Sequence, residues 1–320
     1  MKYRILGRTG LKVSEIGIGT WAMGGPTTLG GIQVGWGDIS DKISIRTLKH
    51  CHNLGINFID TADTYGKGHS EEIIGKALQG MRKKFIIATK CGNYENYKGE
   101  WVQNWNSKYI FRACENSLRR LKTDYIDLYQ IHTPLPGKSN FQFNYKGFKA
   151  FIDLKKSGKI LHYGYSSNHI DDALKVARLG LCDTIQIVYN LFNREAEKEF
   201  FTVVKKKNIG IIVRVPLASG FLTGKFSKEI TFNKNDHRSR LLKKEIRERV
   251  EKIEKIRHIA ESKPGRTLSQ FALQFCLRND AVSVVIPGAK TPEQLEENAK
   301  ASNFKDILPE EITEINHNFY

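Results

Sequence analysis

Four titratable side chains follow apolar runs in the first half of the chain. Asp60 ends the run INFID, Lys90 ends FIIATK and His132 ends DLYQIH, while Tyr65 comes five residues after Asp60. A free phenol titrates near pH ~10, but a neighbouring ammonium group stabilises the phenolate and lowers the pKa. Lys90 can supply that ammonium for Tyr65.

These four side chains together suit proton transfer to a carbonyl oxygen. An Asp60 carboxylate would keep Lys90 charged and aimed, and His132 would donate a hydrogen bond to the oxygen of a bound carbonyl. The group has no nucleophile and no metal, so the electrons must arrive as a hydride from elsewhere. A nicotinamide is the hydride donor that this chemistry requires.

The elements that must position these residues are short β-rich runs separated by amphipathic helical patterns. After a predicted hairpin of residues 3–6 against 13–16, the eight runs are IGIGTW, INFIDTA, KFIIATK, IDLYQIH, HYGYSS, TIQIVYN, IGIIVRV and VSVVIPG. Nearly continuous apolar runs are typical of parallel strands covered on both faces. The pattern predicts an α/β fold, a (β/α)8 TIM barrel with an N-terminal β-hairpin and extra C-terminal helices.

The chain is predicted to form a single barrel domain over residues 1–320, since no Pro/Ser-rich linker or low-complexity segment divides it. In a TIM barrel the C-terminal ends of the strands converge on one mouth. Side chains that follow strand ends are therefore expected to meet there, and the four titratable groups are of this kind.

A doubly wound Rossmann sheet is the rival fold for alternating β and α segments. Its phosphate-binding turn is missing, because Gly17-Ile18-Gly19 is followed by Thr20-Trp21-Ala22 and then by a glycine-rich loop instead of a helix. The segment GFLTGK at residues 220–225 is one residue too short for a P-loop, and no Ser or Thr follows its lysine. The barrel is the better interpretation.

Several motifs resemble the aldo-keto reductase family. They are GTW at residues 19–21, FIDTADTYG at 58–66, ATK at 88–90, QIH at 130–132 and PLASGFLTGK at 216–225, and they occur in the family's order. The resemblance covers nearly the whole chain. It implies that Asp60, Tyr65, Lys90 and His132 are the catalytic tetrad, with Tyr65 giving a proton to the carbonyl oxygen. It also implies NADP(H) as the cofactor.

By the same resemblance, the cofactor would lie extended across the barrel mouth. The residues implied to hold it are Gly19, Thr20, Trp21, Asp60, Ser166, Ser167, Asn168, Gln186, Arg214, Val215, Pro216, Leu217, Ser219, Gly220, Lys225, Gly288, Lys290, Gln294, Glu297 and Asn298. Ser166 and Gln186 match the residues that contact the nicotinamide carboxamide. Either Ser167 or Asn168 takes the place of the family's asparagine.

Two cationic residues are expected to touch opposite ends of the cofactor. Lys290 and the amides at the start of the following helix would hold a 2′-phosphate, because a cation and a helix N-terminus both favour an anion. The position that is often arginine in the family is Gln294 here, so the NADPH preference rests mainly on Lys290. Arg214 stands where many members place a ring against the nicotinamide, and its planar guanidinium can also stack.

The resemblance predicts an NADP-dependent oxidoreductase that reduces aldehydes or ketones to alcohols. Two alternatives stay open: an NADP+-dependent aldose 1-dehydrogenase, and a regulatory NADPH-binding subunit like the β subunits of voltage-gated potassium channels. Substrate specificity would lie in loops 24–38 and 92–106. The aromatic residues there that could line a pocket are Trp36, Tyr94, Tyr97, Trp101 and Trp105.

The net charge of +17 raises the question of an anionic partner. The cations are spread along the chain and alternate with Glu in the richest stretch, so a solvated surface is favoured over a nucleic-acid site. We expect a small-molecule substrate, no nucleic acid, no membrane and a cytoplasmic location, with the oligomeric state open. Five single cysteines indicate reduced thiols. No metal site is predicted, since His50 and His52 of HCH point to different helix faces.

Overall fold

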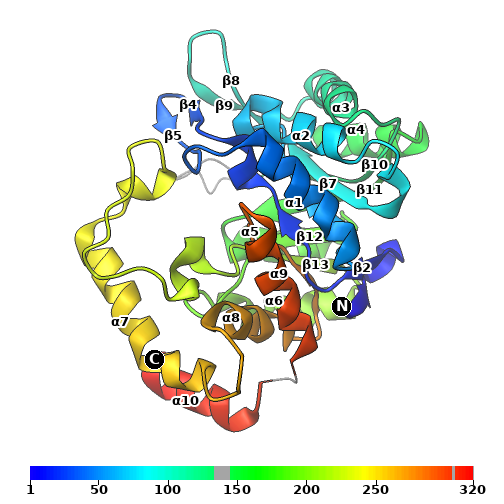
Figure 1. Ribbon diagram of the computed structural model, residues 1–320. Helices are drawn as coiled ribbons and strands as arrows, with labels where there is room; N and C mark the ends of the chain where they lie inside the picture. Colours follow the sequence, from blue (N-terminus) through cyan, green and yellow to red (C-terminus); the bar gives the residue numbers. More distant parts are fainter. Residues whose placement is uncertain (133–144, 305–306, 320) are drawn as a thin grey trace.

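The computed structural model describes residues 1–132, 145–304 and 307–319 of the chain (Figure 1). Its centre is a sheet of eight strands: β3 (Ile18–Gly19), β6 (Phe58–Asp60), β7 (Ile86–Cys91), β10 (Ile126–Ile131), β11 (Ile160–Ser167), β12 (Thr184–Val188), β13 (Gly210–Arg214) and β14 (Val282–Val285). Neighbouring strands are parallel and follow chain order. Bridges from Gly19 to Gly288 and from Ile16 to Val285 close the sheet into a ring. The predicted TIM barrel is confirmed.

Helices surround this barrel (Figure 1). They are α1 (Asp41–Asn53), α2 (His69–Ala77), α3 (Ser107–Leu121), α4 (Tyr145–Lys156), α5 (Ile170–Leu179), α6 (Phe200–Lys206), α7 (Lys243–Ala260), α8 (Leu268–Leu277), α9 (Pro292–Lys300) and α10 (Pro309–Phe319). Helices α7 and α10 are additional to one helix per strand, and they pack against each other at the periphery. They are the extra C-terminal helices that the sequence predicted.

A hairpin of β1 (Tyr3–Ile5) and β2 (Lys12–Ser14) covers the N-terminal end of the barrel. Leu6 and Val13 are fully buried there against Phe58 and other inward-facing residues. The hairpin is confirmed, but its second strand ends at Ser14 because Ile16 already pairs with β14. With this end covered by apolar side chains, the C-terminal mouth is where polar groups gather.

The barrel interior consists of two layers that follow from the alternation of strands. The lower layer is apolar and includes Phe58, Ala88, Leu128, Ile212 and Val284, all fully buried in one cluster. Side chains two positions further along a strand point the same way. The next layer is therefore formed by Asp60, Lys90, Gln130, Ser166, Gln186, Arg214 and Ile286. One strand-end layer thus carries nearly all of the interior polar groups.

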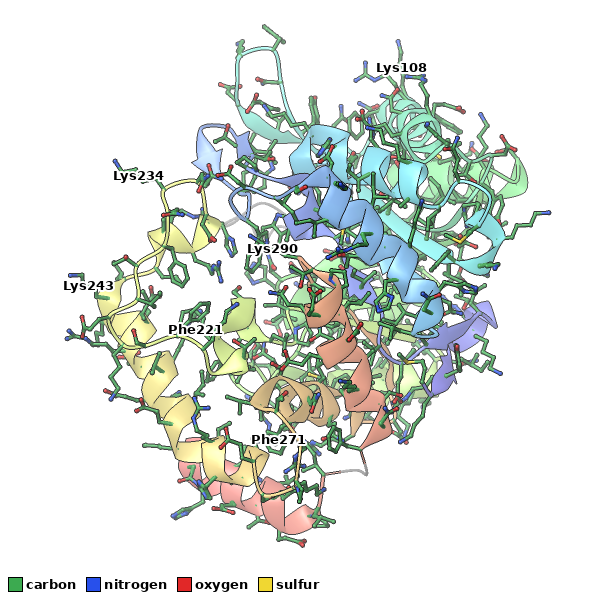
Figure 2. All side chains as sticks on the ribbon, viewed as in Figure 1. Lys108, Phe221, Lys234, Lys243, Phe271 and Lys290 are labelled. Carbon is green, nitrogen blue, oxygen red and sulfur yellow. The ribbon has the colours of Figure 1, made fainter. Side chains whose placement is uncertain are left out.

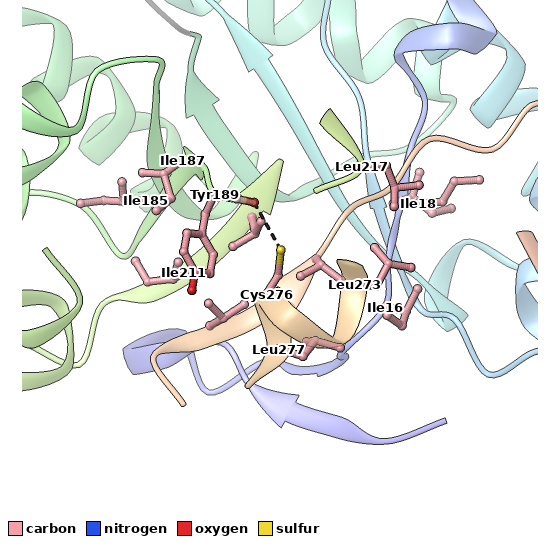
Figure 3. Packing of buried hydrophobic residues seen from close by; sticks show 14 of the residues in the cluster. Ile16, Ile18, Ile185, Ile187, Tyr189, Ile211, Leu217, Leu273, Cys276 and Leu277 are labelled. Atoms are coloured by element: carbon pink, nitrogen blue, oxygen red, sulfur yellow. Dashed lines mark hydrogen bonds between the residues drawn. The ribbon is translucent and has the colours of Figure 1, made fainter. Parts of the chain in front are cut away.

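The outward faces of the strands pack under the helices (Figure 3). Ile185, Ile187 and Ile211 of the strands belong to the same buried cluster as Leu273 and Cys276 of α8, and the Cys276 thiol donates a hydrogen bond to the Tyr189 carbonyl oxygen at 3.3 Å. All five cysteines are buried and unlinked, as predicted. This shell is continuous around the barrel and holds the strand ends at fixed positions.

The positive charge is carried largely by side chains that point outward. Figure 2 shows Lys108, Lys234 and Lys243 at the periphery. On α7 the cations alternate with glutamates and form ion pairs with some of them, such as Arg257 with Glu261 at 3.2 Å. Within the described ranges, no helix combines the length and the apolar character needed to cross a membrane.

Candidate active site

The polar layer at the barrel mouth is built around Lys90, whose side chain is fully buried. Its Nζ lies 2.5 Å from Asp60 Oδ1, 2.7 Å from the Thr61 carbonyl oxygen and 3.4 Å from the Tyr65 hydroxyl. Burial alone lowers the pKa of Lys90, but Asp60 and Tyr65 together raise it above its ordinary value. The ammonium therefore stays charged beside the phenol, because a buried charge is tolerated only with such partners.

The Asp60 carboxylate has hydrogen-bond donors on both oxygens. Lys90 occupies Oδ1, while Oδ2 accepts from Gln186 Nε2 at 2.8 Å and from Gln130 Nε2 at 3.4 Å. The carboxylate is thus held by β7, β10 and β12 at once. Gln130 opens the QIH motif but was given no role from the sequence, although its place two residues after Leu128 on the same strand face was a signal for one.

Tyr65 begins the short 3-10 helix η3 (Tyr65–Gly68) just beyond β6. Gly66 follows with φ of 64°, and a Cβ there would lie 2.3 Å from the Gly24 carbonyl oxygen, so the turn requires glycine. The Tyr65 ring stacks on Trp21 at 6.0 Å and meets the His132 ring edge-on at 5.8 Å. Close packing on both sides fixes the direction of the hydroxyl.

The balance of effects on the Tyr65 phenol differs from the expected one. Burial raises the pKa of Tyr65, Lys90 lowers it, Asp60 raises it and Arg214 lowers it, with a net shift upward. The expected effect of Lys90 is therefore present, but desolvation outweighs it. Tyr65 is protonated at neutral pH, which is the form that can donate a proton.

His132 follows β10 and is held by its backbone N–H, which donates to the Cys91 carbonyl oxygen at 2.8 Å. Burial, with further contributions from Lys90 and Arg214, lowers the pKa of His132 well below its ordinary value. The imidazole is therefore neutral at pH 7. Its Nδ1 lies 3.4 Å from the Thr64 hydroxyl, and when that hydroxyl donates the hydrogen bond to Nδ1 the ring carries its single proton on Nε2.

A cavity of about 350 Å³ extends from this layer along the ends of β13 and β14. Its wall includes most of the residues that the sequence implied for the cofactor. These are Gly19, Trp21, Asp60, Gln186, Arg214, Val215, Pro216, Leu217, Ser219, Gly220, Lys225, Gly288, Lys290, Gln294, Glu297 and Asn298. Tyr65 lies on the same wall, so the acid/base candidate faces the implied cofactor residues.

Four other implied residues do not line this cavity. Thr20 is buried and its hydroxyl donates to the Asp60 carbonyl oxygen at 3.0 Å. Ser166 lies in the polar layer, where its hydroxyl donates to Gln186 Oε1 at 3.3 Å. The Ser167 hydroxyl is bound to the backbone of His169, whereas Asn168 is exposed and accepts a hydrogen bond from Arg214. Ser167 and Asn168 thus differ in their surroundings: the Ser167 hydroxyl is bound to the backbone, and the Asn168 side chain is bound to Arg214.

The segment after β13 has an unusual backbone where it lines the cavity. Val215, Ala218 and Ser219 have φ of 54°, 47° and 59°, in the left-handed region that such residues rarely adopt. Asn190 Nδ2 donates to the Val215 carbonyl oxygen at 2.9 Å and helps to hold this turn. Strained backbone of this kind clusters at ligand sites, where the surroundings can maintain it.

Three cations that follow β13 and β14 in the chain also line the cavity. They are Lys225, Arg238 and Lys290. Lys290 lies beside α9 and its Nζ donates to the Trp36 carbonyl oxygen at 2.6 Å (Figure 2). Burial lowers the pKa of Lys225 and of Lys290, and Arg238 lowers both further. Arg238 is itself paired with Asp236 at 2.6 Å, and the same carboxylate acts against the lowering of the Lys290 pKa.

Arg238 was missed by the sequence analysis because it belongs to a long connection between β13 and α7. Residues 233–238 of this connection form a strap that binds the loop at 33–37. The Asn235 carbonyl oxygen accepts from Gln33 Nε2 at 2.6 Å and from the Gly37 N–H at 3.1 Å. No local pattern in the sequence indicates that this segment returns to the barrel mouth.

The strap also packs against one of the aromatic residues that were expected to line a pocket. Trp36 lines the cavity, and the His237 ring lies 4.3 Å from the Trp36 ring and 4.8 Å from Trp21. Tyr97 is 93% exposed and Tyr94 stacks on Tyr109 at 5.0 Å. Tyr94, Tyr97, Trp101 and Trp105 are not on the cavity wall.

Comparison with known sequences decides the family. The profile of the aldo/keto reductase family matches residues 15–318. The chain belongs to the aldo-keto reductase family. Membership in this family confirms the resemblance that the sequence motifs indicated. It also confirms the prediction of an NADP-dependent oxidoreductase.

Individual relatives agree with this assignment. The chain is 34% identical over 302 residues to aldo-keto reductase YhdN of Bacillus subtilis, covering 92% of this chain and 87% of that protein. It is 31% identical over 332 residues to a probable voltage-gated potassium channel subunit beta of Oryza sativa subsp. japonica, covering 98% and 95%. An aldo/keto reductase from Klebsiella pneumoniae, solved with NADP and acetate, superimposes with a TM-score of 0.74 at 25% identity, covering 100% and 96% of the two chains.

The buried pair of this aldo-keto reductase can be tested through stability. In Asp60→Asn the Lys90 ammonium loses its anion but stays buried, so the free energy of unfolding should fall by roughly 3–5 kcal/mol. The double variant Asp60→Asn/Lys90→Met should regain much of this loss because the uncompensated charge is gone. Urea denaturation at pH 7 measures both, and equal stability of the single and double variants would contradict the assigned pairing.

Proposed function

We propose that this protein reduces aldehydes or ketones to alcohols with NADPH, and that Tyr65 is the general acid. The observation that carries the proposal is the position of the Tyr65 hydroxyl, 3.4 Å from the buried Lys90 ammonium and on the wall of the cavity. A bound carbonyl oxygen within hydrogen-bond reach of Tyr65 would receive its proton as the carbon receives a hydride. The cofactor supplies that hydride when it is bound.

The neighbouring groups each support this proton transfer. Lys90 stabilises the phenolate that Tyr65 becomes, and Asp60 keeps Lys90 charged. A neutral His132 with its proton on Nε2 would donate a hydrogen bond to the same carbonyl oxygen and polarise it. Because Gln130 and Gln186 hold the other oxygen of Asp60, the carboxylate cannot turn away from the lysine.

The residues present fit a nicotinamide dinucleotide along the cavity. Ser166 and Gln186 would hold the carboxamide together with Asn168, which is exposed and accepts a hydrogen bond from Arg214 of the cavity wall, whereas both bonds of the Ser167 hydroxyl go to the backbone of His169. The left-handed turn at residues 215–220 would wrap the pyrophosphate, since consecutive amides in such turns form an anion-binding concavity.

The part of the cavity wall that includes the start of α9 suits the adenosine phosphate. Helix α9 begins after Thr291, whose hydroxyl accepts from the Gln294 N–H, so its N-terminus is well formed. Lys290, Lys225 and Arg238 would face the 2′-phosphate and pyrophosphate as counter-charges. Asn298, which donates to the Gly288 carbonyl oxygen at 3.3 Å, and Glu297 would lie on the adenine side.

One observation favours a second candidate function, a regulatory subunit that binds NADPH without appreciable turnover. The rice relative is named as a probable channel subunit, and an intact tetrad is compatible with such a role. The aldose 1-dehydrogenase alternative uses the same groups with the proton and hydride moving in reverse. A screen of aldehydes, ketones and sugars with NADPH and NADP+ separates the three. Turnover of carbonyls with NADPH indicates the reductase, oxidation of sugars with NADP+ indicates the dehydrogenase, and no turnover in either direction indicates the regulatory subunit.

Removal of the Tyr65 hydroxyl tests the acid directly. Tyr65→Phe should lower kcat for aldehyde reduction by about 10²- to 10⁴-fold, the usual contribution of general acid catalysis, with NADPH binding retained. Tyr97→Phe is the matched control, since Tyr97 is exposed and remote from the cavity wall. Steady-state NADPH oxidation measures both, and a loss below tenfold in Tyr65→Phe would exclude the role.

The pH profiles report the Tyr65 pKa, which is raised above its ordinary value of 10. Reduction needs the phenol, so its rate should be flat through neutral pH and fall only in strong alkali. Oxidation needs the phenolate, so its rate should rise with pH. Lys90 lowers the Tyr65 pKa, so Lys90→Met should move both limbs to higher pH and slow oxidation at pH 8.

The control for this profile is Lys67→Met. Lys67 comes two residues after Tyr65 in the chain, but its side chain is exposed and pairs with Glu95. Rates of both reactions are measured from pH 6 into strong alkali, so that the rise of oxidation and the fall of reduction are both covered. If Lys90→Met lowers the rates but leaves the limbs where they are in the unmodified enzyme, Lys90 does not act through the phenol.

Lys290→Ala should weaken NADPH binding at least about tenfold and leave NADH binding nearly unchanged, because only NADPH has a 2′-phosphate to lose its counter-charge. Calorimetric titration of both cofactors measures the two dissociation constants. Lys243→Ala removes a peripheral lysine and is the control (Figure 2). An unchanged NADPH affinity in Lys290→Ala would mean that the phosphate end is placed wrongly.

A further inference from the structure

Thr64 is a buried residue directly before the proposed acid Tyr65, and its hydroxyl lies against the imidazole of His132. The residue is 8% exposed, and its Oγ1 lies 3.4 Å from His132 Nδ1. The next residue of the same turn, Tyr65, meets the His132 ring edge-on at 5.8 Å. Two consecutive residues therefore contact the imidazole, one through its hydroxyl and the other through its ring.

The backbone attaches Thr64 and His132 to the same strand. The N–H of Asp63 donates to the Lys90 carbonyl oxygen at 3.2 Å, and the N–H of His132 donates to the Cys91 carbonyl oxygen at 2.8 Å. Lys90 and Cys91 are the last two residues of β7. The sheet thus sets the separation between the Thr64 hydroxyl and the imidazole.

The Thr64 hydroxyl makes neither of the local hydrogen bonds that threonine usually makes. Thr64 occupies the N-cap position of η3, yet its side chain accepts no capping hydrogen bond. A threonine can also donate to a backbone carbonyl oxygen one turn earlier, as Thr47 does to Ile43 at 2.9 Å. Within the described part of the chain, the hydroxyl of Thr64 has only His132 Nδ1 as a hydrogen-bonding partner.

The direction of this hydrogen bond follows from the number of buried donors. Burial, with contributions from the nearby cations, lowers the pKa of His132 well below its ordinary value, so at pH 7 the ring has one N–H. With that proton on Nδ1, the hydroxyl would accept it, and the hydroxyl's own proton would have no acceptor among the described groups. With the proton on Nε2, the hydroxyl donates to Nδ1. The second arrangement is favoured, because a buried donor without a partner is costly.

We propose that Thr64 is a positioning residue that keeps the proton of His132 on Nε2, where it forms a hydrogen bond to a substrate carbonyl oxygen. The inference rests on the proposed function, since it assigns a partner to the histidine that polarises the carbonyl group. A ring with its proton on Nδ1 would present the lone pair of Nε2 to the carbonyl oxygen, and two acceptors repel each other. Thr64 acts through His132 and does not touch the substrate.

His132 keeps its proton throughout the reaction. The carbonyl carbon gains the hydride with its two electrons, the Tyr65 proton moves to the carbonyl oxygen, and Tyr65 becomes a phenolate beside Lys90. The hydrogen bond from His132 is strongest while negative charge develops on that oxygen. The effect of Thr64 is therefore expected in the rate of reduction and not in the affinity for the cofactor.

The position of the ring proton can be measured by nitrogen NMR at pH 7. In protein made with nitrogen-15 histidine, protonated and unprotonated ring nitrogens have separate signals, and His132→Gln identifies the signals of His132 among the nine histidines. The unmodified protein should have the proton on Nε2. Thr64→Val removes the hydroxyl but keeps the branched shape, so the ratio of the Nε2–H form to the Nδ1–H form should fall about threefold to tenfold, the usual effect of one neutral hydrogen bond.

A kinetic comparison separates the hydroxyl from packing. In Thr64→Val, kcat/KM for an uncharged aldehyde should fall by about threefold to tenfold, with the Kd of NADPH unchanged. Thr64→Ser keeps the hydroxyl and should retain the proton position, with kcat/KM within about twofold of the unmodified protein. Thr313→Val is the matched control, because Thr313 is exposed on α10 and its hydroxyl donates to Pro309 of the same helix.

The outcomes distinguish this inference from the function on which it rests. The role of Thr64 is wrong, and the proposed function stands, if the unmodified protein has the proton on Nδ1 or if Thr64→Val slows reduction without moving the proton. The same conclusion follows if Thr64→Ser loses as much activity as Thr64→Val. If the proton is on Nε2 and moves in Thr64→Val, but the unmodified protein reduces no carbonyl compound with NADPH, the proposed function fails and the hydrogen bond assigned to Thr64 stands.

Discussion

The ion pair of Lys90 and Asp60 is the constraint on which the barrel mouth depends. An ammonium with no exposure to solvent has to be matched by a carboxylate at hydrogen-bond distance, and that carboxylate then needs donors for its remaining oxygen. Gln130 and Gln186 supply them. Four strands are tied together through a single aspartate in this way. The position of Tyr65 follows, because its hydroxyl is the remaining polar group within reach of the lysine.

The two interior layers have different roles: the lower one is apolar and stabilises the barrel, and the upper one contains the polar groups. Apolar side chains such as Phe58 and Leu128 fill the lower layer and the hairpin closes the end beneath them. The upper layer can then consist of charged and amide groups, which on their own would be costly to bury. Because strand residues alternate strictly, a shift of one residue in a strand would exchange an interior polar group for one that faces the helices. Correct register is therefore a condition of activity as well as of folding.

Two groups of cations lie at the barrel mouth. Lys90 and Arg214 belong to the polar layer, where Lys90 has its own carboxylate. Lys290 and Arg238 are contributed by the start of α9 and by the strap, and both line the cavity. In the proposed binding mode the second group would face the phosphates of the cofactor.

The barrel could be predicted from the alternation of apolar runs and helical patterns, whereas the proposed tetrad and most residues of the cavity wall were located by contiguous motifs that resemble the family. Asp60 and Lys90, for example, are recognisable from the apolar runs that they end. Tertiary structure alone decided three matters: the burial that raises the Tyr65 pKa, the role of Gln130 on the carboxylate, and the return of Arg238 to the mouth. Each depends on contacts between segments far apart in the chain, and desolvation in particular is a property of everything that surrounds a group, which no local pattern records.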